Sequence, residues 1–218
     1  MTQSFTTNHR SMKLECAWET RDPEYIVYHD EHWGTPVLDS QELFAKLCLD
    51  GQQAGLSWLT ILRKQSNYEV AFHQFNPQYI IKMNQNDVSA LMQNKGIVRN
   101  KLKIQSIIKN AHAFLRIEES MPFNAYLWQF SNYRVIKNTC KNANDVATTS
   151  IASNEMAKAL KKSGFSFVGS TICYAFMQAV GMINDHLVTC PRHDILCSQQ
   201  AEVEKKLMGL RKLAANLS

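Results

Sequence analysis

Apolar residues recur at helical intervals along almost the whole chain, and this periodicity limits the fold more than any other feature. Leu43, Phe44, Leu47 and Cys48, for example, would share one face of a helix that opens at Asp39. Only eight glycines and five prolines interrupt the 218 residues. The sequence therefore predicts an all-α fold of helices joined by short loops.

The expected helices follow from these apolar stripes and from capping residues. Asp39 has capping-box spacing to Glu42, and Asn76 precedes Pro77 as a cap precedes a first-turn proline. Ser170 is expected to cap another helix. Only residues 133–136 look extended. The helices predicted are 39–48, 56–62, one from Pro77, 87–93, a long one after Gly96, 153–162, 170–180 and 199–213.

Length and composition suit one globular unit. The chain is 45% hydrophobic and 20% charged, which is ordinary for a globular protein with a full core. We expect residues 1–11 to be a flexible leader, 12–196 a single unit and 197–218 a helical extension. The N-terminus lacks the apolar region of a secretory signal, and no apolar run is long enough to span a membrane. These features predict a cytoplasmic protein that does not bind membranes.

The charge is compatible with a polyanionic partner, because the net formal charge is +5. In the tail, Val203, Leu207, Leu210 and Leu213 form one apolar stripe with basic residues between them. A surface helix folded onto its own unit explains this pattern, and a helix that binds DNA or a partner is the alternative.

Cysteine and histidine residues near both ends of the chain suggest a metal site. His186 and Cys190 have a spacing typical of zinc ligands, and one helical turn would place both on the same face. Cys16 and His29 are two further candidates, and the four would form a closed Cys2His2 site. The spacing leaves Cys197, His32 and His193 as competitors. Cys48 and Cys173 lie in apolar helical patterns and are expected to be buried thiols.

Several collinear segments together match one known family. They are Cys16-Ala17-Trp18, residues 22–26 (DPEYI), 28–34 (YHDEHWG), 49–58 (LDGQQAGLSW), 164–174 (GFSFVGSTICY) and 184–187 (NDHL) with Cys190. Over about residues 14–192 the chain resembles the 3-methyladenine DNA glycosylase I family, which belongs to the helix-hairpin-helix glycosylase superfamily.

The resemblance implies a helical fold and a structural Zn²⁺ held by Cys16, His29, His186 and Cys190. It implies a base pocket between a helical domain and the region where the zinc joins the N- and C-terminal segments. The implied partner is double-stranded alkylated DNA, and the implied product is 3-methyladenine. We expect the protein to act as a monomer.

The resemblance also assigns the pocket. The family has a Glu for base recognition in the block that here reads Leu-Asp-Gly, so the matching residue is Asp50. The carboxylate is kept, but on a side chain one methylene shorter. A displacement of about 1 Å can cost on the order of 100-fold in rate. Trp58 matches the stacking residue, Tyr28 is expected to add a polar contact, and Trp18 and Tyr25 to form the walls.

Residues 94–103 correspond to the DNA-binding hairpin of the family. Gly96 would allow a tight turn, and exposed N–H groups at the start of the next helix could bind phosphate. We expect Gly96, Val98, Arg99 and Lys101 to contact DNA, with Lys95 and Lys103 adding charge. Phosphate contact or solvation would explain Lys101 and Lys103. Leu56 resembles a wedge that fills the gap of a flipped nucleotide, although a core leucine is the simpler alternative.

The expected reaction is hydrolysis of the N-glycosidic bond of 3-methyladenine, with a flipped base and water as nucleophile. The family lacks the catalytic Asp that many superfamily members place after the hairpin. The chain also lacks a Leu-Pro-Gly-Val-Gly hairpin followed by a Lys nucleophile, so strand cleavage is not expected. The shorter Asp50 supports one alternative, a zinc-stabilised protein that binds damaged DNA with weak or lost excision. A protein that acts only through its tail helix is a third hypothesis.

Overall fold

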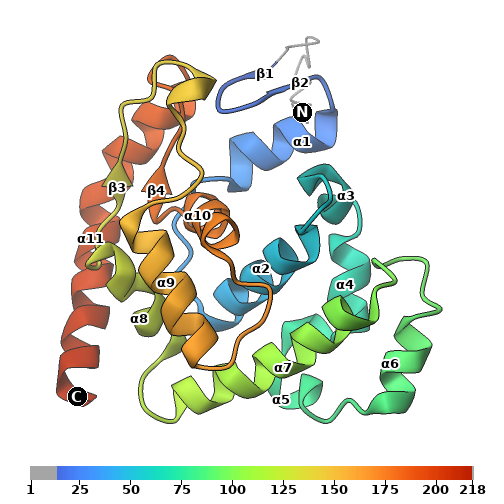
Figure 1. Ribbon diagram of the computed structural model, residues 1–218. Helices are drawn as coiled ribbons and strands as arrows, with labels where there is room; N and C mark the ends of the chain where they lie inside the picture. Colours follow the sequence, from blue (N-terminus) through green and yellow to red (C-terminus); the bar gives the residue numbers. More distant parts are fainter. Residues whose placement is uncertain (1–13, 218) are drawn as a thin grey trace, which may run out of the picture.

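Helices form nearly all of the regular structure in the computed structural model, which describes residues 14–217 (Figure 1). The α-helices are α1 (Pro23–Val27), α2 (Ser40–Gln53), α3 (Trp58–Leu62), α4 (Gln65–Ala71), α5 (Pro77–Ile80), α6 (Gln85–Leu91), α7 (Lys101–Glu118), α8 (Phe123–Trp128), α9 (Ile151–Lys162), α10 (Ser170–Ala179) and α11 (Pro191–Leu217). A π-helical turn, η1 (Tyr28–His32), continues α1, and short 3-10 turns cover His73–Phe75, Gln129–Ser131 and Ala143–Asp145. The predicted helical fold is confirmed.

Four two-residue strands complete the structure. β1 (Leu14–Glu15) pairs antiparallel with β2 (Glu19–Thr20), and β3 (Ile136–Lys137) pairs parallel with β4 (Ile183–Asn184), with Ile136 opposite Ile183. The predicted extended segment at 133–136 is therefore only partly right, because Tyr133 has a positive φ of 55° and the strand begins at Ile136.

Side-chain caps set where several helices begin. The Asp39 carboxylate accepts hydrogen bonds from the N–H groups of Gln41 and Glu42, and Asn76 caps α5 ahead of Pro77, as predicted. The prediction for Ser170 is wrong. This residue is the first of α10, and Gly169 occupies the capping position without a side-chain bond.

The boundaries of three other helices differ from the prediction for similar reasons. Ser150 starts α9 two residues early, Asn84 starts α6 with a capping box, and Ser57 delays α3 to Trp58. In each case a polar residue accepts hydrogen bonds from the free N–H groups of the first turn and so sets where the helix begins. The spacing of apolar residues does not indicate such a cap.

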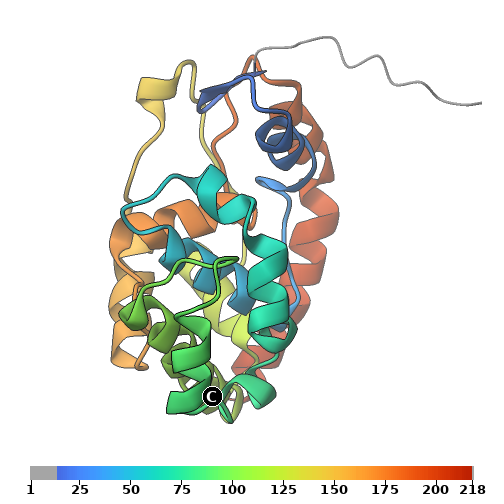
Figure 2. The ribbon, with the colours of Figure 1, turned by 90° about the vertical axis from the view of Figure 1, so that its right-hand side faces the viewer.

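Helix α2 lies at the centre of the core. Its residues Leu43, Phe44 and Leu47 are fully buried, and it contacts α3, α7, α8 and α10. Cys48 and Cys173 are buried thiols, as expected. Figures 1 and 2 show the N-terminal strands and the free end of α11 at opposite ends of the molecule.

Helix α11 is longer than the predicted segment 199–213 and packs against α8. It buries Leu196, Leu207 and Ala214 against the rest of the chain. The predicted leader, residues 1–11, lies outside the described residues. Across residues 14–217, no helix is both long and apolar enough to cross a membrane.

Gly181, after α10, is a position that no other residue could fill without strain. Its φ is +72°, and a Cβ there would lie 2.5 Å from the backbone nitrogen of Pro36 and 2.6 Å from the carbonyl oxygen of Gly34. This close approach brings the segment before α2 onto the end of α10, beside the loop that carries His186.

We predict that Gly181→Ala lowers the free energy of unfolding by about 2 kcal/mol or more, because it combines a positive φ with backbone overlap. Gly209→Ala is the matched control. Gly209 is exposed in α11, and a Cβ added there would meet nothing within 4 Å. That control should be neutral or stabilising by up to about 1 kcal/mol. Urea denaturation measures both, and equal stability of the two variants would contradict the steric argument.

Candidate functional site

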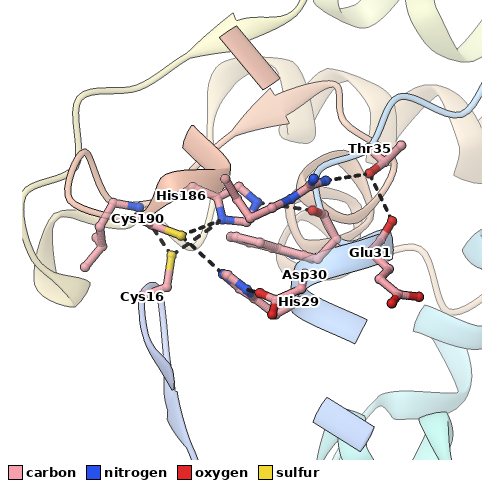
Figure 3. Close-up of polar contacts among 10 residues, drawn as sticks. Cys16, His29, Asp30, Glu31, Thr35, His186 and Cys190 are labelled. Atoms are coloured by element: carbon pink, nitrogen blue, oxygen red, sulfur yellow. Dashed lines mark hydrogen bonds and ion pairs between the residues drawn. The ribbon is translucent and has the colours of Figure 1, made fainter. Parts of the chain in front are cut away.

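Four potential metal ligands from the two ends of the chain meet in one buried cluster. The ligand atoms of Cys16, His29, His186 and Cys190 all lie within 4.8 Å of one another, and all four residues are buried (Figure 3). Cys16 follows β1, His29 lies in η1, and the other two follow β4. The sequence neighbours that competed with them, Cys197 and His193, lie together on α11 with their Sγ and Nδ1 atoms 4.0 Å apart.

The distances between these atoms fit one tetrahedral ion. His186 Nδ1 is 3.6 Å from both Cys16 Sγ and Cys190 Sγ, and His29 Nε2 is 3.8 Å from Cys190 Sγ. With Zn–S near 2.3 Å and Zn–N near 2.0 Å, a tetrahedral site has S···N edges of about 3.5 Å. The cluster can therefore hold a metal ion of this size with little rearrangement.

The second nitrogen of each imidazole is already bound to the protein. His29 Nδ1 is 2.7 Å from Asp30 Oδ1, and His186 Nε2 is 3.1 Å from the carbonyl oxygen of Trp33. A proton on each of these nitrogens leaves the opposite lone pair facing the cluster. Such outer hydrogen bonds orient metal-binding histidines.

A non-helical turn brings His186 and Cys190 together, whereas the sequence predicted that one turn of a helix would do so. The Cys190 N–H donates to the carbonyl of Leu187 at 2.8 Å, and α11 begins only at Pro191. Proline at the first helical position explains this, because the residue before it is disfavoured in the α conformation.

The charges of the cluster favour a thiolate. The pKa of Cys190 is lowered because hydrogen bonds from Cys16, His186 and His29 stabilise its sulfur anion, and the pKa of Cys16 is raised because it keeps the shared proton. Burial opposes protonation of His29, but Cys190 and Asp30 outweigh it and raise the pKa of this imidazole. The thiolate is the form that binds metals.

Asp185 fixes the loop that carries His186. Its carboxylate accepts hydrogen bonds from Tyr174 Oη at 2.8 Å, Gln178 Nε2 at 2.7 Å and Asn138 Nδ2 at 2.6 Å. These partners belong to α10 and to the segment after β3. No role for Asp185 was predicted from the sequence, and the available signal was its position inside the family block 184–187.

A row of aromatic rings leads from the cysteine and histidine cluster to a second buried site. Trp18 contacts the edge of His29 with centroids 5.5 Å apart and stacks on Tyr25 at 5.3 Å. Tyr25 lies 6.2 Å from Tyr28, and Tyr28 lies 5.3 Å from Trp58. The four aromatic residues that the sequence proposed for a pocket therefore form one continuous group.

Asp50 and Trp58 meet at the end of this row. Asp50 is 3% exposed and Trp58 is 7% exposed. Among residues 14–217, the buried Asp50 Oδ2 and Trp58 Nε1 atoms have no hydrogen-bond partner, nor does Trp18 Nε1. Burial raises the pKa of Tyr28 well above its usual value, with a further contribution from the Asp50 charge. Unpaired polar atoms in such a site are available to a ligand.

Lys46 completes this group, although sequence analysis did not single it out. Its Nζ forms an ion pair with Asp50 Oδ1 and lies 3.8 Å above the centroid of the Trp58 ring. Burial raises the pKa of Asp50, and Lys46 opposes this rise. The i,i+4 spacing of Lys46 and Asp50 on α2 was the available signal.

The segment between α6 and α7 is a tight turn held by side chains. The Gly96 N–H donates to Asn94 Oδ1 at 2.8 Å, and the Val98 N–H donates to Tyr68 Oη at 3.1 Å. Gly96 is required by close contact, since a Cβ there would lie 2.9 Å from the Asn67 side chain. Asn100 caps α7, and Arg99 and Lys101 are exposed beside it.

Lys103 corrects the sequence interpretation, which expected phosphate contact or solvation. It is 6% exposed, and its Nζ donates to the carbonyls of Gln52 and Ala54 at 2.7 Å each. Leu56 lies after the C-terminal end of α2, in the turn before α3, and is 40% exposed. It is therefore not a buried core leucine.

These observations define a class: a helical protein with a closed aromatic and carboxylate site next to a Cys2His2 cluster. The family model for methyladenine glycosylases matches residues 18–193. DNA-3-methyladenine glycosylase 1 of Escherichia coli (strain K12) is 49% identical over 176 residues, which cover 80% of this chain and 94% of the relative. The chain belongs to the methyladenine glycosylase family.

Solved structures show the same fold. A crystal structure of 3-methyladenine DNA glycosylase I has a TM-score of 0.80 at 48% identity and covers 82% of this chain and 98% of its own. A variant of such an enzyme, solved in complex with 3-methyladenine, has a TM-score of 0.79 at 38% identity, with 81% and 96% covered.

We predict that Cys190→Ser removes most of the bound metal and lowers the melting temperature, because it replaces a thiolate ligand. Elemental analysis of the purified protein should find about one ion per chain in the parent and far less in the variant. Cys197→Ser, which changes a thiol outside the cluster, is the control and should keep the metal. Unchanged metal content in Cys190→Ser would contradict the ligand set.

Proposed function

We propose that this protein is a monofunctional DNA glycosylase that hydrolyses the N-glycosidic bond of 3-methyladenine in alkylated double-stranded DNA. The observation that carries the proposal is a buried carboxylate and a buried indole, Asp50 and Trp58, that both contact Lys46 in a chain of this family. Its relatives are named as enzymes that act on 3-methyladenine.

The chemistry of the substrate explains why these residue types suffice. Methylation of adenine at N3 gives the base a positive charge and weakens the bond to the sugar. When C1′–N9 breaks, the bonding electrons neutralise the base, so the leaving group needs no proton. The enzyme must mainly extrude the base and hold it in a closed pocket.

In this mechanism Asp50 accepts hydrogen bonds from the adenine edge through its unpaired Oδ2. Trp58 stacks on the cationic ring, an attraction of about 0.5–2 kcal/mol. Tyr28, buried against Trp58, adds a polar contact, and Trp18 and Tyr25 form the wall behind it. Water attacks C1′ and loses its proton to solvent.

We propose that the ion in the cluster is Zn²⁺ with a structural role. Two thiolates and two imidazoles are its usual ligands, and four protein ligands leave no open position for a substrate. The ion would hold the β1–η1 segment against the loop before α11 and so fix Tyr25 and Tyr28 opposite Trp58. It would supply no step of the reaction.

For DNA binding we propose the turn at Gly96 and Val98, with Arg99 and Lys101 beside the N-terminus of α7. Exposed cations beside the positive end of a helix dipole suit phosphate and give affinity that falls with salt. Leu56, exposed at the turn after α2, is proposed to fill the gap of the extruded nucleotide.

The alternative, a damage-binding protein without efficient excision, rests only on the shorter Asp50. The high identity to named glycosylases favours the enzyme. Release of free bases from methylated duplex DNA, separated by chromatography, tests the choice. 3-Methyladenine should appear well above 7-methylguanine. DNA binding without base release by metal-loaded protein would support the alternative.

We predict that Asp50→Asn lowers the rate of 3-methyladenine release by about 100-fold or more, because the negative charge at the base edge is lost. Its metal content should stay the same. Asp194→Asn, which changes an exposed carboxylate on α11, is the control. Full activity of Asp50→Asn would remove Asp50 from the mechanism.

For Leu56→Ala we predict slower excision from duplex DNA at nearly unchanged stability, because Leu56 is exposed and does not belong to the hydrophobic core cluster. Leu213→Ala, 44% exposed on α11, is the control and should keep full activity. Both changes should alter the free energy of unfolding by no more than about 1 kcal/mol. If the two variants excise equally well, Leu56 is not a wedge.

A further inference from the structure

The ammonium group of Lys46 lies between Asp50 and Trp58, the two residues proposed to bind the base. Lys46 lies one helical turn before Asp50 on α2, and its ammonium reaches both the Asp50 carboxylate and the face of Trp58, 3.8 Å from the ring centroid. The side chain is 17% exposed and Asp50 only 3%. A base stacked on this face of Trp58 and bound to Asp50 cannot share that space with the ammonium.

Lys46 makes there the two interactions that a methylated adenine would make, a cation over an indole and a positive charge beside a carboxylate. The remaining polar atoms of the site, Asp50 Oδ2 and Trp58 Nε1, have no hydrogen-bond partner in the part of the chain that the structure describes. Lys46 therefore stands in for the charge of the base but leaves the base's hydrogen-bonding positions open.

We propose that Lys46 is a displaceable competitor for the base site, which a cationic base drives out and which returns to expel the neutral base after cleavage. This inference rests on the proposed function. It makes Lys46 a residue that controls product release and not one that takes part in bond breaking.

The base loses its positive charge during the reaction, and this change determines when Lys46 leaves the site and when it returns. A cationic base replaces the ammonium on Asp50 and Trp58 with an equal charge, so entry exchanges one cation for another. Cleavage of C1′–N9 returns the electron pair to the base, water bonds to C1′, and the base becomes neutral. A neutral base attracts the carboxylate and the indole face less strongly than the ammonium does, so Lys46 can then regain its place.

Freedom to move is built into the lysine side chain. Four rotatable bonds carry the ammonium, and the stem can lie along apolar surface while the charge reaches water. The partial exposure of Lys46 offers such a path, whereas Asp50 and Trp58 are fixed in the core.

The test compares Lys46→Met with the parent and with Lys82→Met. Methionine keeps the unbranched stem but removes the charge. Lys82 is a matched control, because its Nζ lies 5.2 Å from the ring centroid of Tyr79, outside this site. Multiple-turnover release of 3-methyladenine from methylated duplex is measured with increasing amounts of free 3-methyladenine.

For Lys46→Met we expect the inhibition constant of free 3-methyladenine to fall by about tenfold, because no cation competes for Trp58. A burst of one turnover followed by a slower steady rate should appear. The parent and Lys82→Met should show neither effect. Product inhibition of folded, metal-loaded Lys46→Met equal to that of the parent would overturn the proposal.

Two further measurements keep the test decisive. If Lys46→Met does not fold, Lys46→Gln replaces it, since an amide can donate to Asp50 without a charge. If the parent releases no base, the proposed function fails, and calorimetric titration of free 3-methyladenine into parent and variant still tests Lys46. Tighter binding by the variant supports the proposal, and equal binding overturns it.

Discussion

The meeting of Cys16 and His29 with His186 and Cys190 is the contact on which the rest of the site depends. It joins residues that are 157 (His29 and His186) to 174 (Cys16 and Cys190) positions apart along the chain. α1 is short and has no buried residue, and η1 buries only Tyr28 and His29. The cluster, together with the ion pairs of Arg63 with Asp22 and Glu24, therefore holds Tyr25 and Tyr28 next to α2 and α3.

The order of the helices could be predicted from the sequence, because the helical spacing of apolar residues indicates which face of each helix is buried. The long α7 and the capped α2 and α5 were recovered in this way. The cap of α10 and the turn before Cys190 were not, since local backbone conformation and Pro191 decide them. Two lysines show the same limit. Lys103 is buried and Lys46 is paired, and nothing in a helical pattern distinguishes such lysines from solvated ones.

The site residues were assigned by resemblance more than by physical chemistry. A Cys or His spacing left several ligand sets open, and only the geometry shows four donor atoms within 4.8 Å. For Asp50, the resemblance raised the question of a carboxylate one methylene too short. The structure answers with Lys46, which contacts that carboxylate from the same helix. The question is therefore no longer whether the Asp50 side chain is long enough to reach a base. It is whether Lys46 occupies the place where the base would bind.

The position of Lys103 has a consequence for the surface that is proposed to face DNA. The carbonyl groups at the end of α2 carry the negative end of a helix dipole, and they lie just before Leu56 in the turn that is proposed to enter the duplex. The Lys103 ammonium binds two of these carbonyls, at Gln52 and Ala54. A polyanion that approaches Leu56 therefore meets a helix end whose negative dipole charge is compensated by the ammonium of Lys103. Lys103 is buried and is not among the residues proposed to contact DNA.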